Sequence, residues 1–283
     1  MPYTTLVDTD ELAVHLGDPG WVVFDCRFTL TDPGAGLRAY NEGHIPGARY
    51  VHLDNDLSSP VTERTGRHPL PDPEQLAIKL GAWGVDASKQ VVVYDDTFGA
   101  MAVRMWWLLR WLGHENVALL DGVFPKWLRE KRTVTKELPV IEPAVFKASP
   151  NNTMWISADE IQALTAGTGV VVDARAEERY SGEVEPLDKV AGHVPGAINL
   201  PWEDNLDLGG DFLPAGELRE LYAPIVGQHA IKNVIHMCGS GVTACHNILA
   251  MEHAGLKGAR LYAGSWSEWI TDPSRPVKTG EQA

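Results

Sequence analysis

The sequence has few cysteines, no excess of basic residues and no long apolar run. Three cysteines in 283 residues cannot form a disulfide framework, and this number is typical of a reducing compartment. The formal net charge is -14, and no Lys/Arg cluster offers a surface for nucleic acid or for an anionic membrane. No apolar run approaches the ~20 residues of a transmembrane helix, and residues 1–20 lack the pattern of a signal peptide. We therefore expect a cytoplasmic protein that binds neither nucleic acid nor a membrane.

An internal repeat accounts for the length of the chain, which exceeds what one hydrophobic core usually serves. Asp-Cys-Arg at 25–27 ends one apolar run, and Asp-Ala-Arg at 173–175 ends another. The turn GHIPGA at 43–48 returns as GHVPGA at 192–197. The chain is therefore predicted to contain two copies of one domain.

Each copy alternates short β-branched runs with amphipathic segments. The expected strands are residues 21–25, 91–95, 170–174 and 233–237, and the expected helices are residues 101–113 and 243–255. Such alternation indicates an α/β fold with a mostly parallel sheet flanked by helices. We predict an N-terminal domain at 1–137, a linker at 138–154 with few periodic residues, and a C-terminal domain at 155–283.

Cys238 follows the last expected strand and opens the loop CGSGVT before a helix. The N-terminal end of a helix favours a thiolate over a thiol. Gly239 and Gly241 permit backbone angles that turn successive N–H groups, including those of Val242 and Thr243, toward one anion. Ligands of open α/β sheets bind beyond the carboxyl ends of strands, so this loop is the candidate active site.

The first copy carries no cysteine at the matching place. The segment LLDGVFPKW at 119–127 matches LYAGSWSEW at 261–269, and the spacing between the two places Asp96 opposite Cys238. Only the second copy is therefore expected to be catalytic.

Other chemistry for Cys238 is less well supported by the sequence. A cysteine phosphatase needs Cys-x5-Arg, but Ala244 stands at that place and no basic residue follows until Lys257. The chain has no Cys-x2-Cys pair for zinc, and we expect neither a metal nor a cofactor. Cys238 could instead be a small packing residue, which is the role we expect for Cys26 and Cys245. The flanking glycines favour a reactive Cys238.

Together, CGSGVTA, the paired GH[IV]PGA turns, the Asp-x-Arg strand ends and GSWSEW at 264–269 resemble the two-domain rhodanese superfamily, especially its 3-mercaptopyruvate sulfurtransferases. The resemblance covers nearly the whole chain. It implies tandem rhodanese-like domains, of which only the second is catalytic. It also implies a reaction in which the active cysteine takes sulfur from a small donor as a persulfide. The acceptor is then a thiol, such as thioredoxin or a small thiol, or cyanide.

The resemblance assigns further residues by position. Arg179 matches the arginine that binds the anionic group of the donor, although by itself it could be a solvated surface charge. In the related enzymes the serine at Ser240 joins a histidine and an aspartate from the N-terminal domain. His44 of GHIPGA fits that histidine, and Asp32 is the nearest aspartate. His193, the counterpart of His44 in the second copy, is expected only to stabilise a turn. His44 could have that structural role as well.

The sequence departs from the mercaptopyruvate enzymes at one donor-binding position. These enzymes often have a second arginine after Glu-Pro, but Leu187 follows Glu-Pro here, with Lys189 two residues further on. Lys189 can supply a point charge but not a bidentate contact to a carboxylate. Thiosulfate enzymes of the superfamily carry Arg and Lys directly after the cysteine, where this chain has Gly239 and Ser240. We therefore favour 3-mercaptopyruvate as the donor, with thiosulfate, or a non-catalytic rhodanese-like binding module, as alternatives.

Overall fold

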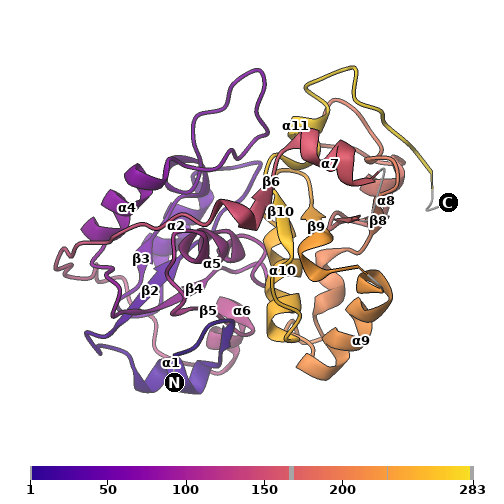
Figure 1. Cartoon of the computed structure of the whole chain (residues 1–283). Helices are drawn as coiled ribbons and strands as arrows, with labels where there is room; N and C mark the ends of the chain where they lie inside the picture. Colours follow the sequence, from indigo (N-terminus) through magenta and orange to yellow (C-terminus); the bar gives the residue numbers. More distant parts are fainter. Residues whose placement is uncertain (1, 166–168, 228, 281–283) are drawn as a thin grey trace. The chain divides into compact units, whose positions relative to one another are not determined.

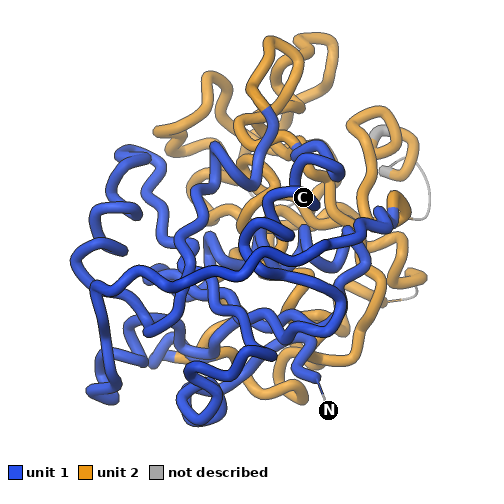
Figure 2. The backbone as a smooth tube through the Cα atoms, turned by 90° about the vertical axis from the view of Figure 1, so that its left-hand side faces the viewer, with its two compact units in different colours: residues 1–59, 70–151, 208–211 blue, residues 60–69, 152–207, 212–283 orange. Residues whose placement is uncertain are grey.

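The computed structural model describes residues 2–165, 169–227 and 229–280, which fall into two compact units (Figures 1 and 2). Unit 1 consists of Met1–Ser59, Leu70–Asn151 and Leu208–Asp211. Unit 2 consists of Pro60–Pro69, Asn152–Asp207 and Phe212–Ala283. The last three residues of the predicted C-terminal domain lie outside the described residues.

The composition of the two units differs from the predicted domains in three segments. Residues 60–69 come from the N-terminal half of the chain but belong to unit 2, and residues 208–211 from the C-terminal half belong to unit 1. Residues 138–151 of the predicted linker belong to unit 1, where the N–H groups of Ala144 and Ser149 donate to backbone carbonyls of that unit. A linker without regular elements is thus fixed to unit 1 by its backbone.

Unit 1 is built on a parallel sheet with the strand order β1-β5-β4-β2-β3 (Figure 1). Its strands are β1 (Leu6–Val7), β2 (Trp21–Asp25), β3 (Arg49–Tyr50), β4 (Gln90–Tyr94) and β5 (Val117–Leu120). Its helices are α1 (Thr9–Val14), α2 (Ala35–Glu42), α3 (Leu53–Asp56), α4 (Pro73–Ala82), α5 (Ala102–Trp111) and α6 (Val123–Arg129). Every residue of β4 is buried, as expected for a strand of a parallel sheet that is covered on both faces.

Unit 2 repeats this topology with the strand order β6-β10-β9-β7-β8, again parallel throughout. Its strands are β6 (Trp155–Ile156), β7 (Val170–Asp173), β8 (Ile198–Asn199), β9 (Val234–Met237) and β10 (Arg260–Tyr262). Its α-helices are α7 (Ala158–Thr165), α8 (Glu177–Ser181), α9 (Ala215–Val226), α10 (Ala244–His253) and α11 (Ser265–Trp269), and its 3-10 turns are η1 (Asn152–Met154), η2 (Trp202–Asn205) and η3 (Ile231–Asn233). The predicted fold class, a pair of parallel α/β domains, is confirmed.

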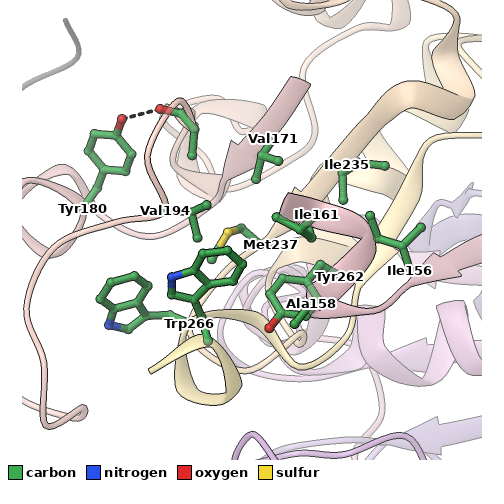
Figure 3. Close-up of a cluster of buried hydrophobic side chains, with 12 residues drawn as sticks. Ile156, Ala158, Ile161, Val171, Tyr180, Val194, Ile235, Met237, Tyr262 and Trp266 are labelled. Carbon is green, nitrogen blue, oxygen red and sulfur yellow. Dashed lines mark hydrogen bonds between the residues drawn. The ribbon is translucent and has the colours of Figure 1, made fainter. Parts of the chain in front are cut away.

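The repeated GH[IV]PGA turn has the same internal contacts in both units. In unit 2, Arg175 donates to Asp173 and to the carbonyl of Gly192, and His193 stacks on Tyr180 with ring centroids 3.9 Å apart. The Tyr180 hydroxyl donates to the carbonyl of Ala197, which Figure 3 shows as a dashed line. Arg175 thus ties the end of β7 to the turn.

In unit 1 the equivalent residues make the equivalent bonds. Arg27 donates to Asp25 and to the carbonyl of Gly43, and His44 stacks on Tyr40 with ring centroids 3.9 Å apart. A buried arginine paired with a buried carboxylate therefore closes the same turn in both units, which gives the Asp-x-Arg and GH[IV]PGA motifs a structural role.

A buried apolar cluster in unit 2 includes the strand residue that precedes Cys238 (Figure 3). It includes Ile235 and Met237 of β9, Tyr262 of β10 and Trp266 of α11. Met237 is the residue before Cys238, so the strand end that carries the cysteine is fixed by core packing.

Candidate active site

Cys238 lies at the carboxyl end of β9, and α11 holds its backbone on both sides. The Cys238 N–H donates to Oγ of Ser265 at 3.0 Å, and the Cys238 carbonyl accepts from the N–H of Trp266 at 3.0 Å. The carbonyl of Gly239 accepts from the N–H of Ser267 at 2.9 Å. The role of the GSWSEW motif is therefore to fix the position of the cysteine loop from the neighbouring strand end.

The loop requires glycine at 241. Gly241 has φ of +75°, and a Cβ built there would lie 2.2 Å from the carbonyl oxygen of Ala263. A side chain at this place would collide with backbone and would also occupy the left-handed region that disfavours it. Val242 and Thr243 lead into α10, and their carbonyls accept from the N–H groups of Cys245 and His246, both at 3.0 Å. Glycine at 241 therefore lets the chain turn tightly between β9 and α10.

Ser240 forms a buried hydrogen bond with His68, with Nδ1 of His68 2.7 Å from Oγ of Ser240. His68 belongs to the segment 60–69 of unit 2. A Cβ on Gly66 would lie 2.5 Å from the carbonyl oxygen of Gly264, so this segment runs directly against the backbone before α11. The cysteine loop thus has a hydroxyl two residues after Cys238 that is hydrogen-bonded to an imidazole.

Two arginines lie over the residue that follows the cysteine. A Cβ on Gly239 would be 2.7 Å from Nη2 of Arg67 and 3.5 Å from Nη1 of Arg179. Arg179 is the residue on α8 that the sequence predicts to bind the donor, and its Nη2 donates to Glu185 at 2.8 Å. Arg67 was not predicted from the sequence, and it pairs with Asp188. Two guanidinium groups therefore lie close to Gly239, whereas the loop 238–243 itself contains no Lys or Arg.

Two buried carboxylates hold these arginines. Burial alone would raise the pKa of Glu185, but hydrogen bonds from Arg179 and from the backbone N–H groups of Leu187 and Asp188 hold that pKa below its usual value. Burial raises the pKa of Asp188, and the nearby charges of Arg67 and Arg179 only partly offset this. The two carboxylates are thus shifted in opposite directions, the pKa of Glu185 downward and that of Asp188 upward.

The comparisons with known proteins agree on one family. The rhodanese-like domain family matches residues 8–130 and 157–272. The chain belongs to the rhodanese family. It is 48% identical over 284 residues, which cover 99% of this chain and all of its relative, to a protein of Pseudomonas aeruginosa named "probable 3-mercaptopyruvate sulfurtransferase".

Other relatives of this rhodanese are named for two different sulfur donors, thiosulfate and 3-mercaptopyruvate. The bovine thiosulfate sulfurtransferase is 34% identical over 95% of this chain and 92% of its own length. The crystal structure of the 3-mercaptopyruvate sulfotransferase SseA from Escherichia coli is 33% identical, with a TM-score of 0.79 over 94% of this chain and all of that one. Family membership therefore supports sulfur transfer from a small donor.

The histidine predicted as the partner of Ser240 needs correction. His44 is buried in unit 1, where its Nδ1 lies 2.8 Å from the carbonyl oxygen of Tyr40 and its Nε2 lies 3.2 Å from that of Glu137. It has the same turn-closing role as His193. The residue hydrogen-bonded to Ser240 is His68, which the sequence analysis missed because no periodic pattern or motif marks the loop 60–69.

Two further predicted residues have other surroundings within their own units. The Asp32 side chain is 52% exposed and pairs with Arg38 in unit 1. Lys189 is exposed and follows Asp188 in the chain, whereas the side chains that pair with Asp188 are those of Arg67 and Arg179.

In the other rhodanese domain, an aspartate stands at the place of Cys238. Strand pairing matches Asp25 with Tyr94 in unit 1 and Asp173 with Met237 in unit 2, so Cys238 corresponds to Asp95 rather than to the predicted Asp96. The buried Asp95 carboxylate accepts four backbone hydrogen bonds at 2.8–2.9 Å, from the N–H groups of Thr97, Gly99, Met101 and Ala102. Burial raises the pKa of Asp95, and these four hydrogen bonds partly offset the rise, so the backbone of this loop binds a carboxyl group.

The other two cysteines of this rhodanese are packing residues. Cys26 and Cys245 are buried, and burial raises the pKa of the Cys26 thiol well above its usual value, with Asp25 and Asp95 adding to the rise. The Sγ of Cys245 lies 3.5 Å from the carbonyl oxygen of Gly241.

The described residues contain neither a metal-binding cluster nor a membrane span. No group of three or more His, Cys, Asp or Glu side chains within residues 2–165, 169–227 and 229–280 is arranged to hold a metal ion. In the same part of the chain, no helix is both long and apolar enough to cross a membrane.

Proposed function

We propose that this rhodanese transfers sulfane sulfur from 3-mercaptopyruvate to a thiol or to cyanide through a persulfide on Cys238. The observation that carries the proposal is the Ser240–His68 pair beside the cysteine loop. Loss of sulfur from mercaptopyruvate leaves an enolate carbon that must receive a proton. A hydroxyl hydrogen-bonded to an imidazole is suited to deliver one.

In the proposed reaction the Cys238 thiolate attacks the sulfur of the donor. The S–S bond forms as the bond between that sulfur and C3 of the donor breaks, and the electron pair of the broken bond goes to the enolate. The proton of the donor thiol ends on C3, which gives pyruvate and leaves the persulfide anion on Cys238. The equivalent loop of unit 1 supports a role for the backbone in stabilising this anion, because four of its N–H groups donate to the Asp95 carboxylate.

The acceptor step regenerates the enzyme. A thiol, from thioredoxin or from a small molecule, or cyanide attacks the outer sulfur of the persulfide, and the Cys238 thiolate leaves. The logic is that of thiol–disulfide exchange, in which a stable thiolate is a good leaving group.

Thiosulfate is the second candidate donor, and a specific observation favours it. Arg67 and Arg179 both lie near Gly239, so the site has two cations for a dianion. Asp188 and Glu185 offset this charge, however, and thiosulfate makes no use of a proton donor because its leaving group, sulfite, is a stable anion. These points favour the carboxylate donor.

A donor comparison tests the proposal. Intact mass should show one added sulfur atom after incubation with mercaptopyruvate, and kcat/KM should favour mercaptopyruvate over thiosulfate at least about tenfold, or ~1.4 kcal/mol. Cys238→Ser should abolish sulfur transfer, whereas the matched variant Cys245→Ser should retain it. Equal or faster turnover of thiosulfate by the wild type would overturn the choice of donor, and residual transfer by Cys238→Ser would overturn the choice of nucleophile.

A further inference from the structure

Unit 1 contains a cavity of about 240 Å³ at the amino ends of two of its strands. Trp21, the first residue of β2, and Lys89, the residue before β4, both line it. Asp95 directly follows the other end of β4, so the cavity lies at the opposite end of the sheet from the Asp95 loop. All of its lining residues belong to unit 1, whereas Cys238 belongs to unit 2. The cavity is therefore distinct from the candidate active site.

Arg49 of β3 lines this cavity at a point where the wall is fixed by backbone contacts. A Cβ on Gly84 would lie 3.6 Å from Nη2 of Arg49 and 2.8 Å from the carbonyl oxygen of Glu142. Gly84 comes just after α4, and the N–H of Ala144 donates to the carbonyl of Gly81 within that helix at 2.8 Å. The segment predicted as a linker is thus held against the end of α4 and supplies part of the wall.

The guanidinium of Arg49 has hydrogen-bonding capacity that unit 1 does not use. Its Nε is buried and has no hydrogen-bond partner within the part of the chain that the structure describes. Its Nη1 donates to the carbonyl of Gly47 over a long 3.4 Å. Burial lowers the pKa of Arg49, and Tyr40 rather than a carboxylate opposes this shift. A buried donor left unpaired is costly, and Nε and Nη2 form the edge of a guanidinium that binds a carboxylate with two parallel bonds.

The other charged groups at the cavity are bound elsewhere or are exposed. Nζ of Lys89 donates to a backbone carbonyl at 2.8 Å. Asp18 accepts from the N–H of Gly20 at 2.7 Å, and its second oxygen lies 3.1 Å from Nδ1 of His15. Glu142 is exposed. The two carboxylates disfavour a ligand with several negative charges, so the open guanidinium edge suits a monoanion.

Much of the remaining wall is apolar. It includes Leu16, Val22, Val23, Pro46, Pro139 and Val140. Trp21 stacks on His15 with ring centroids 4.1 Å apart, which fixes the indole at the wall. Pockets for small molecules commonly combine such apolar walls with a few polar groups that orient the ligand. The cavity is also smaller than those that hold drug-sized ligands.

We propose that unit 1 binds a small monocarboxylate with an apolar body in this cavity, and that Nε and Nη2 of Arg49 hold its carboxylate. The site is specific to unit 1. Arg49 pairs with Phe24 at the start of β3, and the equivalent residue of unit 2 is Ile198, which pairs with Val172 at the start of β8. This inference goes beyond sulfur transfer and does not depend on it.

The test uses 4-methylpentanoate as the probe and its neutral amide, 4-methylpentanamide, as the matched compound. The indole N–H resonance of Trp21, assigned with Trp21→Phe, reports binding at the cavity in proton–nitrogen NMR spectra of the full chain. The carboxylate should shift this resonance saturably, and the amide should bind at least about tenfold more weakly. Arg49→Met should weaken binding of the carboxylate about 10–100-fold, and Arg49→Lys should give an intermediate Kd because it keeps the charge but not the two-bond edge.

The matched control is Arg38→Met, which removes an exposed arginine of unit 1 that pairs with Asp32 and should leave the Kd at the wild-type value. Without the probe, Arg49→Met should keep the urea midpoint of the wild type, because the buried Nε has no bond to lose. A lower midpoint would show that Arg49 serves the fold and would overturn the proposal. Equal affinity for the two probes, a wild-type Kd in Arg49→Met, or no saturable shift of the Trp21 resonance would overturn it as well.

Discussion

His68 and His44 are the two candidates for the catalytic histidine, and we expect different consequences when each is replaced. His68 is hydrogen-bonded to Ser240 in the cysteine loop, whereas His44 closes a turn in unit 1. We expect His68→Ala to lose turnover while the protein remains folded. We expect His44→Ala to lose stability while the turnover of each folded molecule is kept.

The magnitudes follow from these contacts. A positioned general acid contributes about 10²–10⁴-fold, so His68→Ala should lower kcat with mercaptopyruvate by this factor, or about 3–5 kcal/mol of barrier. His44 makes two hydrogen bonds to carbonyls, each worth about 0.5–1.5 kcal/mol, and one ring stack of similar value. Unit 1 should therefore lose about 2–4 kcal/mol of its free energy of unfolding in His44→Ala.

The assay is single-turnover formation of the Cys238 persulfide at saturating donor, followed by intact mass, together with urea unfolding of each variant. Thiosulfate serves as an internal control, because sulfite needs no proton, and His68→Ala should slow it much less than mercaptopyruvate. Ser240→Ala should resemble His68→Ala, and the double variant should be little worse than either one because the two residues act as a unit.

Two results would refute this reasoning. If folded His44→Ala lost as much turnover as His68→Ala, the catalytic histidine would be the one first expected from the sequence. If His68→Ala slowed both donors equally, His68 would act by holding the loop rather than by supplying a proton.

Three further changes have defined outcomes. Asp95→Asn puts an amide N–H₂ among backbone N–H donors and should lower the free energy of unfolding of unit 1, measured in urea, by about 2–4 kcal/mol. Persulfide formation on Cys238 should persist in this variant. A loss under about 0.5 kcal/mol would contradict the role of this loop in binding the carboxylate. Burial lowers the pKa of His236 to about 3, so the unfolded chain takes up a proton below about pH 6.5 that the folded chain does not. The free energy of unfolding should thus fall by up to about 1.4 kcal/mol for each unit that the pH is lowered from about 6.5 to 3. His236→Gln should make the free energy of unfolding less dependent on pH over this range. Equal pH dependence in the wild type and the variant would contradict the role of His236. Gly241→Ala should slow persulfide formation at least about tenfold, because its Cβ would push against the Ala263 carbonyl; a wild-type rate would show that the loop can shift.

Local patterns in the sequence were enough to predict the four strands β2, β4, β7 and β9, the two helices α5 and α10, and the repeated turn. The run at 90–94 is buried because both faces of a parallel sheet are covered, and the pattern of such a run can be recognised without a structure. The start of α7 also has a local signal, a capping box in which the Ser157 N–H donates to the Glu160 carboxylate at 2.8 Å. The position of Cys238 after β9 followed from the same reasoning.

The partners of the cysteine loop could not be predicted in this way. Ser240 and His68 are 172 residues apart in the chain, and the loop that brings them together has no helical or strand period. The shift from Asp96 to Asp95 has a similar cause. The sequence comparison was anchored at residues 119–127, beyond α5, whereas strand pairing fixes the equivalence at β4. Contacts between loops depend on tertiary packing, which a single sequence does not encode in a local pattern.

The assignment of residues 60–69 to unit 2 bears on how a duplicated chain evolves. Immediately after a tandem duplication, either half can be deleted without harm to the other. Here a gene encoding only residues 152–283 would specify Cys238 without Arg67 and His68, since both are encoded in the first half. If sulfur transfer uses the Ser240–His68 pair as proposed, selection on that activity retains residues 60–69 together with the second half.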